Sequence, residues 1–172
     1  YNKCNFIKRP KHLSLDNTPS ADVAVHVLHH LKEKNNYFPD AIILLQPTSP
    51  FRNSIHIDEA IKMYQSEPMS KSLVSVTKVP HNMIPESIMK KDSNNQLTHY
   101  KNSDTLRRQD KPFYYARNGA AIYIVETNFF LKEQKFFDNG SIGYEMNYFD
   151  SIDIDNHEDW LLAEILMKYK TL

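Results

Sequence analysis

Two aspartates near the C-terminus, Asp153 and Asp155, stand two positions apart in the run Asp150-Ser151-Ile152-Asp153-Ile154-Asp155. In an extended segment such residues share one face, while Ile152 and Ile154 face the other way. Two carboxylates on one face repel each other unless a cation lies between them, and their hard oxygens suit Mg²⁺. The spacing is compatible with a magnesium site, but taken alone it slightly favours a strand that ends here and leads into a helix.

A second polar segment, Gln46-Pro47-Thr48-Ser49-Pro50-Phe51-Arg52, directly follows a run of apolar residues. It carries an amide, two hydroxyl groups and a guanidinium, which can hold a polar ligand. If the apolar run is a central parallel strand, this loop lies at the strand's C-terminal end, where ligands bind in open α/β sheets. A proline-stiffened turn in which Thr48 or Ser49 caps a backbone group explains the same residues equally well.

Three arginines, Arg107, Arg108 and Arg117, lie within eleven positions ahead of another apolar run. Guanidinium groups bind carboxylates or phosphates through paired hydrogen bonds, so this cluster suits an anionic ligand. Solvation at the surface is the more frequent fate of arginine. The following Asn118-Gly119 is typical of a tight turn.

The composition excludes several classes of protein. The 172 residues carry 21 Lys+Arg against 21 Asp+Glu, and this balance argues against binding to nucleic acid or to an anionic membrane. No stretch approaches the roughly 20 apolar residues of a membrane span. The single cysteine, Cys4, excludes an internal disulfide and agrees with a cytoplasmic location. Three glycines are too few for a glycine-rich loop that cradles phosphates.

Hydrophobic periodicity predicts the elements that must position these groups. We expect helices over about 20–34, 55–66 and 157–170, a short helix from Thr127, buried strands over 41–45, 73–76 and 120–125, and a weak strand at 146–148. Strand, helix, strand in this order implies a parallel sheet with a right-handed crossover. Between Pro80 and Pro112 the pattern weakens, which suggests an antiparallel excursion with short strands near 84–89 and 97–100.

Together these segments resemble the acylneuraminate cytidylyltransferase family, whose members make CMP-activated sialic acids and related nonulosonic acids. Four blocks carry the match in the family's order: Arg9-Pro10 with Leu13, Asp16 and His26; Leu44 to Arg52; Arg108-Gln109 with Asn118 to Tyr123; and Asp150 to Asp155 with Asp159 and Ala163-Glu164. The resemblance spans nearly all of the chain. The second and fourth blocks together are too specific to arise by chance.

The resemblance implies a three-layer α/β/α, Rossmann-like nucleotidyltransferase fold with a mostly parallel sheet. Residues 1–172 would form a single cytidylyltransferase domain, and residues 80–115 an antiparallel arm through which two copies form a homodimer. Members of the family begin with a strand and a basic, glycine-containing loop around the CTP triphosphate. We expect this sequence to begin after that segment.

The resemblance also implies a reaction, in which the anomeric hydroxyl of an acidic nine-carbon sugar attacks the α-phosphate of CTP and pyrophosphate leaves, with Mg²⁺ as cofactor. Such transfer depends mainly on positioning and on charge neutralisation. By their place in the motifs, Asp153 and Asp155 would bind the metal and Arg108 would act on the sugar carboxylate as the third catalytic residue. The implied substrate contacts are Gln46, Pro47, Thr48, Ser49, Arg117, Asn118 and Gly119 on the sugar side, and Arg9 and Ser20 near cytosine and ribose.

Two other interpretations stay open. Without a phosphate loop of its own, the chain could be a non-catalytic remnant that binds a sugar or forms dimers. The acceptor could instead be legionaminic, pseudaminic or another acidic sugar. A cytidylyltransferase for the eight-carbon sugar acid of lipopolysaccharide ranks lower, because its C-terminal motif lacks the Ser-Ile-Asp-Ile-Asp present at 151–155.

Overall fold

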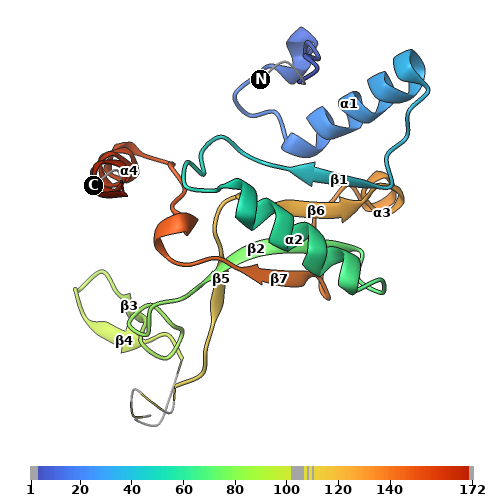
Figure 1. The fold of residues 1–172 in the computed structure, drawn as a ribbon. Helices are drawn as coiled ribbons and strands as arrows, with labels where there is room; N and C mark the ends of the chain where they lie inside the picture. Colours follow the sequence, from blue (N-terminus) through green and yellow to red (C-terminus); the bar gives the residue numbers. More distant parts are fainter. Residues whose placement is uncertain (1–3, 102–106, 108, 110, 171–172) are drawn as a thin grey trace.

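A five-stranded sheet forms the centre of the molecule in the computed structural model, which describes residues 4–101, 107, 109 and 111–170 (Figure 1). Its strands are β1 (Ala41–Leu44), β2 (Ser72–Lys78), β5 (Tyr115–Arg117), β6 (Tyr123–Glu126) and β7 (Ile142–Glu145). β6 lies between β1 and β2 and runs antiparallel to both, whereas β7 pairs with β2 in parallel.

The expected mostly parallel sheet is therefore wrong, because the sheet is mixed. β1 and β2 do run in the same direction, as the strand-helix-strand order predicts, since each is antiparallel to β6. The difference arises after β2. The chain leaves the sheet there and comes back in the opposite direction, first as β5 and then as β6 between the two parallel strands.

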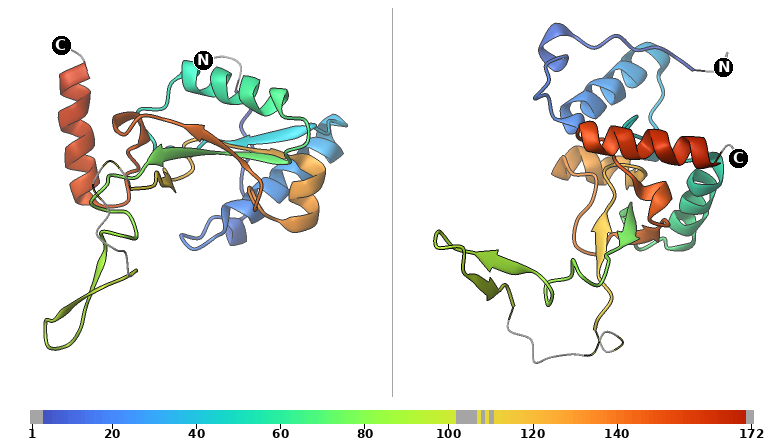
Figure 2. Two further views of the ribbon diagram at one scale, coloured as in Figure 1. Left: turned by 90° about the horizontal axis from the view of Figure 1, so that it is seen from below. Right: turned by 90° about the vertical axis from the view of Figure 1, so that its left-hand side faces the viewer.

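Helices cover both faces of this sheet, which gives three layers (Figure 2). On one face α2 (Ser54–Ser66) packs its buried Ala60 into a cluster with Leu73 and Ile124. On the other face α1 (Ser20–Asn35) and α3 (Thr127–Glu133) pack around Val125. Neighbouring residues of β6 thus point to opposite layers, as expected for a strand buried on both faces.

The returning strand is interrupted where it passes β2. Arg117 of β5 pairs with Val76, and Tyr123 of β6 pairs with Val74, so five residues, 118–122, stand opposite the single residue Ser75. In a bulge of this size the side chains of the longer strand no longer alternate between the two faces of the sheet, and they can point in other directions. The sequence predicts an unbroken strand over 120–125, whereas β6 begins only at Tyr123, and β5 is not among the expected strands.

The predicted antiparallel excursion is confirmed as a hairpin that projects from the sheet (Figures 1 and 2). Its strands are β3 (Met89–Lys91) and β4 (Leu97–His99), so the first strand begins at Met89 and not near 84 as expected. At its base the nearly buried carboxylate of Glu86 accepts hydrogen bonds from Lys101 Nζ (2.9 Å) and Tyr114 OH (2.8 Å). These bonds hold both ends of the excursion together.

Near the N-terminus lies a short 3-10 turn, η1 (Lys11–Leu13). The C-terminal part adds another, η3 (Phe149–Ser151), and the helix α4 (His157–Lys170). α4 packs against the rest of the molecule through Ala163 and Leu166, which join a cluster with Phe51 and Ile152. The weak strand expected at 146–148 lies instead at Ile142–Glu145, because Gly143 hides the apolar alternation there. Among the described residues, no helix combines the length and the hydropathy that a membrane span requires.

Candidate functional site

The three polar motifs meet at one cavity of about 380 Å³, here called the acidic cavity. Its lining consists of Ser20, Leu44, Gln46, Arg117, Gly119, Ala120, Tyr123, Phe136, Asp153 and Asp155. Residues more than a hundred positions apart in sequence therefore share one space. It lies beyond the C-terminal end of β1, at the place where ligands enter open α/β sheets.

Asp153 has an unusual setting within this cavity. Its Oδ1 is buried and has no hydrogen-bond partner among the residues that the structure describes. Gly119 lies directly against the carboxylate, and a Cβ on Gly119 would come within 2.7 Å of Oδ1 and closer still to Oδ2 and Cγ. A buried carboxylate oxygen without a donor is costly unless a cation or a ligand reaches it. The unpartnered oxygen of Asp153 can therefore accept a cation or a hydrogen-bond donor, and Gly119 leaves room for the carboxylate.

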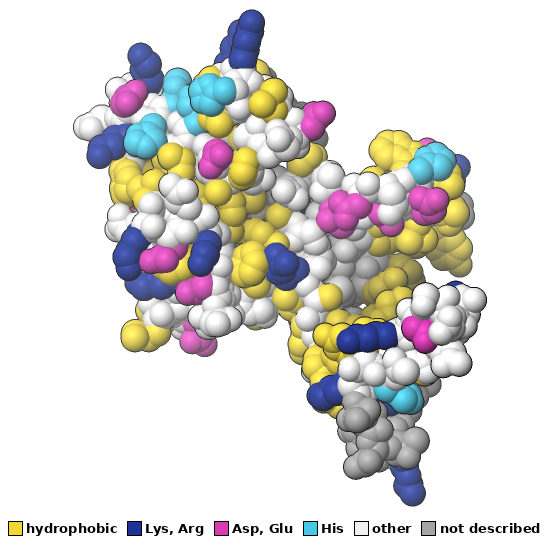
Figure 3. All heavy atoms as spheres, turned by 180° about the vertical axis from the view of Figure 1, so that it is seen from behind, with side chains coloured by type: hydrophobic (Ala, Val, Ile, Leu, Met, Phe, Trp, Pro, Cys, Tyr) yellow, Lys and Arg dark blue, Asp and Glu magenta, His cyan; other side chains and the backbone are white. Residues whose placement is uncertain are grey.

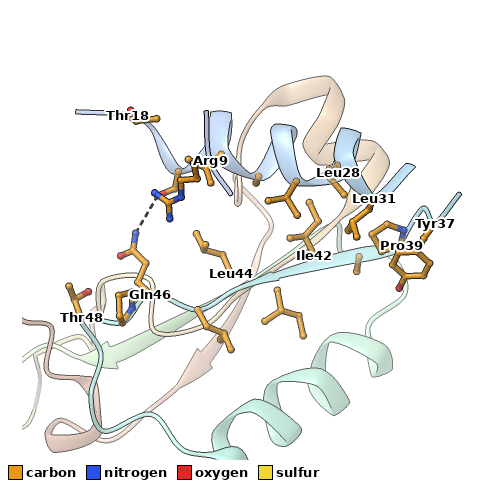
Figure 4. A pocket seen from close by; sticks show the side chains of 18 residues that line it. Arg9, Thr18, Leu28, Leu31, Tyr37, Pro39, Ile42, Leu44, Gln46 and Thr48 are labelled. Carbon is orange, nitrogen blue, oxygen red and sulfur yellow. Dashed lines mark hydrogen bonds between the residues drawn. The ribbon is translucent and has the colours of Figure 1, made fainter. Parts of the chain in front are cut away.

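A larger groove of about 640 Å³ adjoins the acidic cavity and shares Ser20, Leu44 and Gln46 with it (Figure 4). Most of its wall is apolar, from α1 and β1. The polar groups gather at one end, where Gln46 Nε2 donates to Ser20 Oγ (3.5 Å) beside Arg9. A flat, largely apolar ligand with a polar end fits such a groove.

Hydrogen bonds to the backbone hold the three polar motifs in place relative to one another. Arg52 Nη1 donates to the carbonyl oxygens of Gln46 and Ala121, each at 2.9 Å. The N–H of Ile154 donates to Thr48 O (2.9 Å), which fixes the segment between the two aspartates. Burial lowers the pKa of Arg52 from its ordinary value. The sequence predicts Arg52 as one of a set of ligand-binding groups, but its guanidinium donates to these two backbone carbonyls.

The other predicted residues fall into three groups. Arg9, Pro47 and Thr48 line the groove, as Figure 4 shows for Arg9 and Thr48. Ser49 and Asn118 are buried, with 2% and 4% of their surface exposed, and line neither space. Arg108 lies outside the described residues.

Arg117 supplies the positive charge of the acidic cavity. Its guanidinium lies over the ring of Phe137, 4.6 Å from the ring centroid, and this contact orients it. The aromatic wall formed by Tyr123 and Phe136, whose rings are 6.2 Å apart, was not predicted. Tyr123 belongs to a strand that sequence alone assigns entirely to the core, and nothing in the sequence distinguishes its face.

Comparison with known proteins finds several relatives with similar names, although no family model matches the chain. N-acylneuraminate cytidylyltransferase of Escherichia coli O18:K1:H7 is 32% identical over 166 residues, which are 96% of this chain and 38% of that protein. The enzyme of the same name from Streptococcus agalactiae serotype V is 31% identical, over 91% of this chain and 36% of that protein.

CMP-N,N'-diacetyllegionaminic acid synthase of Legionella pneumophila is 28% identical over 93% of this chain and 67% of its own length. A solved structure of CMP:2-keto-3-deoxy-manno-octonic acid synthetase complexed with CTP shares the fold, with a TM-score of 0.60 over 90% of this chain and 70% of that one. Its sequence is 12% identical, so it supports the fold alone.

The chain spans less than two fifths of the length of the two cytidylyltransferases named first. Their identity is nevertheless spread over nearly all of its own residues. The resemblance seen in the four sequence blocks is confirmed, and the chain is a relative of the acylneuraminate cytidylyltransferase family.

Proposed function

We propose that this chain forms the sugar-acid and metal side of a cytidylyltransferase site. The anomeric oxygen of an acidic nine-carbon sugar attacks the α-phosphorus of CTP, the bond from that phosphorus to the bridging oxygen breaks, and pyrophosphate leaves. The hydroxyl proton passes to solvent. The observation that carries this proposal is the meeting of Asp153, Asp155, Gln46 and Arg117 at one cavity.

The donor set fits a magnesium ion. Asp153 and Asp155 both line the acidic cavity, and Asp153 Oδ1 is buried without a partner among the described residues. No group of three or more His, Cys, Asp or Glu side chains suited to a metal occurs in the described part of the chain. Mg²⁺ is commonly bound by one or two carboxylates together with water and phosphate oxygens, and when bound it neutralises triphosphate charge.

The substrates fit the two adjoining spaces. On the sugar side, the Gln46 amide can both donate to and accept from hydroxyl groups, and Arg117 can pair with a carboxylate. Arg108 is proposed for the same carboxylate. The apolar groove, with Arg9 and Ser20 at its polar end, suits the pyrimidine and ribose of CTP. CTP as a substrate is also consistent with our expectation of a cytoplasmic location.

We further propose a homodimer formed through the arm. Figure 3 shows hydrophobic side chains on the projecting hairpin and on α4. Leu97 and Tyr100 of the hairpin are each 57% exposed, and apolar side chains that lie together on a surface can mark a protein–protein interface. A second copy packed against this hairpin would cover them.

Replacing the aspartates tests the proposed function. In the product of the complete reading frame that encodes this chain, Asp153→Asn or Asp155→Asn should lower pyrophosphate release from CTP and N-acetylneuraminic acid by about 100-fold or more. Asp138→Asn, at an exposed carboxylate outside both spaces, is the matched control and should keep full turnover. Full turnover in both site variants would contradict the metal assignment.

A non-catalytic remnant is the second candidate, and the low glycine count favours it. The 172-residue chain, mixed with CTP, Mg²⁺ and N-acetylneuraminic acid, should release no pyrophosphate if the triphosphate needs a further loop. Release by this chain would exclude the remnant. Competition between N-acetylneuraminic acid, legionaminic acid and 2-keto-3-deoxy-manno-octonic acid in the same assay identifies the acceptor.

A further inference from the structure

Ser75 stands alone opposite the five-residue bulge, and its hydroxyl replaces the backbone pairing that is interrupted there. Its own N–H donates to Ile122 O (2.9 Å), and the N–H of Ile122 donates to Ser75 Oγ (2.9 Å). The single hydroxyl hydrogen goes to Asn118 Oδ1 (2.7 Å). One buried side chain thus ties both ends of the bulge to β2.

Asn118 connects the bulge to the segment that contains Asp153 and Asp155. Because Ser75 donates to its Oδ1, the amide nitrogen must face the other way. There Nδ2 donates to Ser151 Oγ (3.0 Å) and contacts Met146 Sδ (3.4 Å). Both ends of the amide are therefore engaged inside the protein, and the buried Asn118 lines neither the acidic cavity nor the groove.

The bulge and the aspartate segment meet at Gly119 and Asp153. Gly119 adopts φ +65°, and its Cα lies so close to the Asp153 carboxylate that no Cβ fits between them. Asn118 precedes Gly119 directly, and Ser151 is two residues before Asp153. The Asn118–Ser151 bond therefore fixes the distance between the two segments on the side away from the cavity.

We propose that Ser75, Asn118 and Ser151 are positioning residues that hold the Gly119 turn against Asp153 and so set the place of its carboxylate. This rests on the proposed function, because it assigns these residues to the metal site formed by Asp153. None of the three lines the acidic cavity or the groove. They act through Asp153, as outer residues commonly do for metal ligands.

The test compares Ser75→Ala with Ser72→Ala. Ser72 lies in the same strand, is equally buried, and exchanges a hydrogen bond with Ser141 Oγ (2.6 Å) instead of supporting the bulge. In the complete protein, Ser75→Ala and Ser151→Ala should raise the Mg²⁺ concentration for half-maximal pyrophosphate release by about tenfold or more. High Mg²⁺ should restore much of kcat, which loss of folded protein would not allow. Ser72→Ala should keep the wild-type Mg²⁺ dependence.

A second readout on the 172-residue chain needs neither metal nor turnover. Amide hydrogen exchange at Ile122 should become at least tenfold faster in Ser75→Ala and stay unchanged in Ser72→Ala, because only the first removes its acceptor. Equal Mg²⁺ dependence in Ser75→Ala and Ser72→Ala, or equal exchange at Ile122, overturns the positioning role. Full activity of Asp153→Asn instead overturns the metal assignment, so the two failures are distinguishable.

Discussion

Gly119 shows at the scale of one residue how the backbone prepares the site. It needs a positive φ for the turn, and it must lack a side chain for Asp153 to lie against it. Glycine meets the first need at no steric cost, and the second need excludes every other residue type. The two requirements can be separated by experiment, because Gly140 has only the first.

Gly119→Ala should therefore cost more than Gly140→Ala. Both positions have positive φ, +65° and +98°, and share the penalty for alanine there, about 1 kcal/mol or more. Only at position 119 would the new methyl group collide with Asp153, since nothing lies within 4 Å of the Cβ position at Gly140. Urea unfolding and pyrophosphate release measure the two effects. Equal behaviour of the two variants would contradict the close contact.

At this scale the sequence predicts which residues gather at the cavity better than it predicts which of them face the protein interior. Asp153, Asp155, Gln46 and Ser20 do line one cavity. Asn118 was expected beside the sugar and is buried in a hydrogen-bond network instead. A short polar side chain looks the same in sequence whether it faces a ligand or the interior, because its partners are far away along the chain.

At the scale of elements, the helices and core strands followed from hydrophobic periodicity. The direction of β6 did not, because the apolar run that forms it is compatible with either orientation. β5 was missed because all three of its residues are exposed and lack a buried face. The sequence also does not show which side chains join segments that lie far apart along the chain. Arg52, which donates to Gln46 O and Ala121 O, is the clearest case.

Arg52→Met should weaken the connection between the loop after β1 and the bulge at 118–122. The variant leaves the carbonyl oxygens of Gln46 and Ala121 without the donor that joins them, and bonds from a charged donor contribute about 1.5–3 kcal/mol each. We expect a loss of about 2–4 kcal/mol in the free energy of unfolding by urea. Lys132→Met, at an exposed lysine on α3, is the control and should change it by less than about 0.5 kcal/mol.

The arm should be sensitive to acid through Glu86. Hydrogen bonds from Lys101 and Tyr114 hold the pKa of Glu86 below its ordinary value. Its contribution is therefore complete above the unfolded pKa, about 4.3, and is lost as pH falls through the lower folded value. Glu86→Gln should lower the thermal midpoint at pH 7, and this gap should narrow at pH 3. A gap that stays constant between these pH values would contradict the ion pair.

At the scale of the whole molecule, the projecting hairpin and α4 both carry exposed apolar residues, among them Leu97 and Tyr100 on the hairpin and Trp160 and Ile165 on α4. Leu97→Glu on the hairpin should lower the mass measured by sedimentation from that of a dimer to that of a monomer, since a buried charge opposes association. Met69→Glu, at a residue that is 91% exposed and outside the hairpin, should leave the mass unchanged. A wild-type monomer would contradict the proposed dimer.

The bulge at 118–122 also uncouples the register of the projecting hairpin from the register of the buried strand β6. In an unbroken strand, the insertion of one residue turns every following side chain to the opposite face. Here the pairing of β5 with β2 ends before that of β6 begins, so a change of length on the hairpin side is absorbed before it reaches the core. The projecting arm can thus vary in length and register while the buried strand that supports the site keeps its alternation.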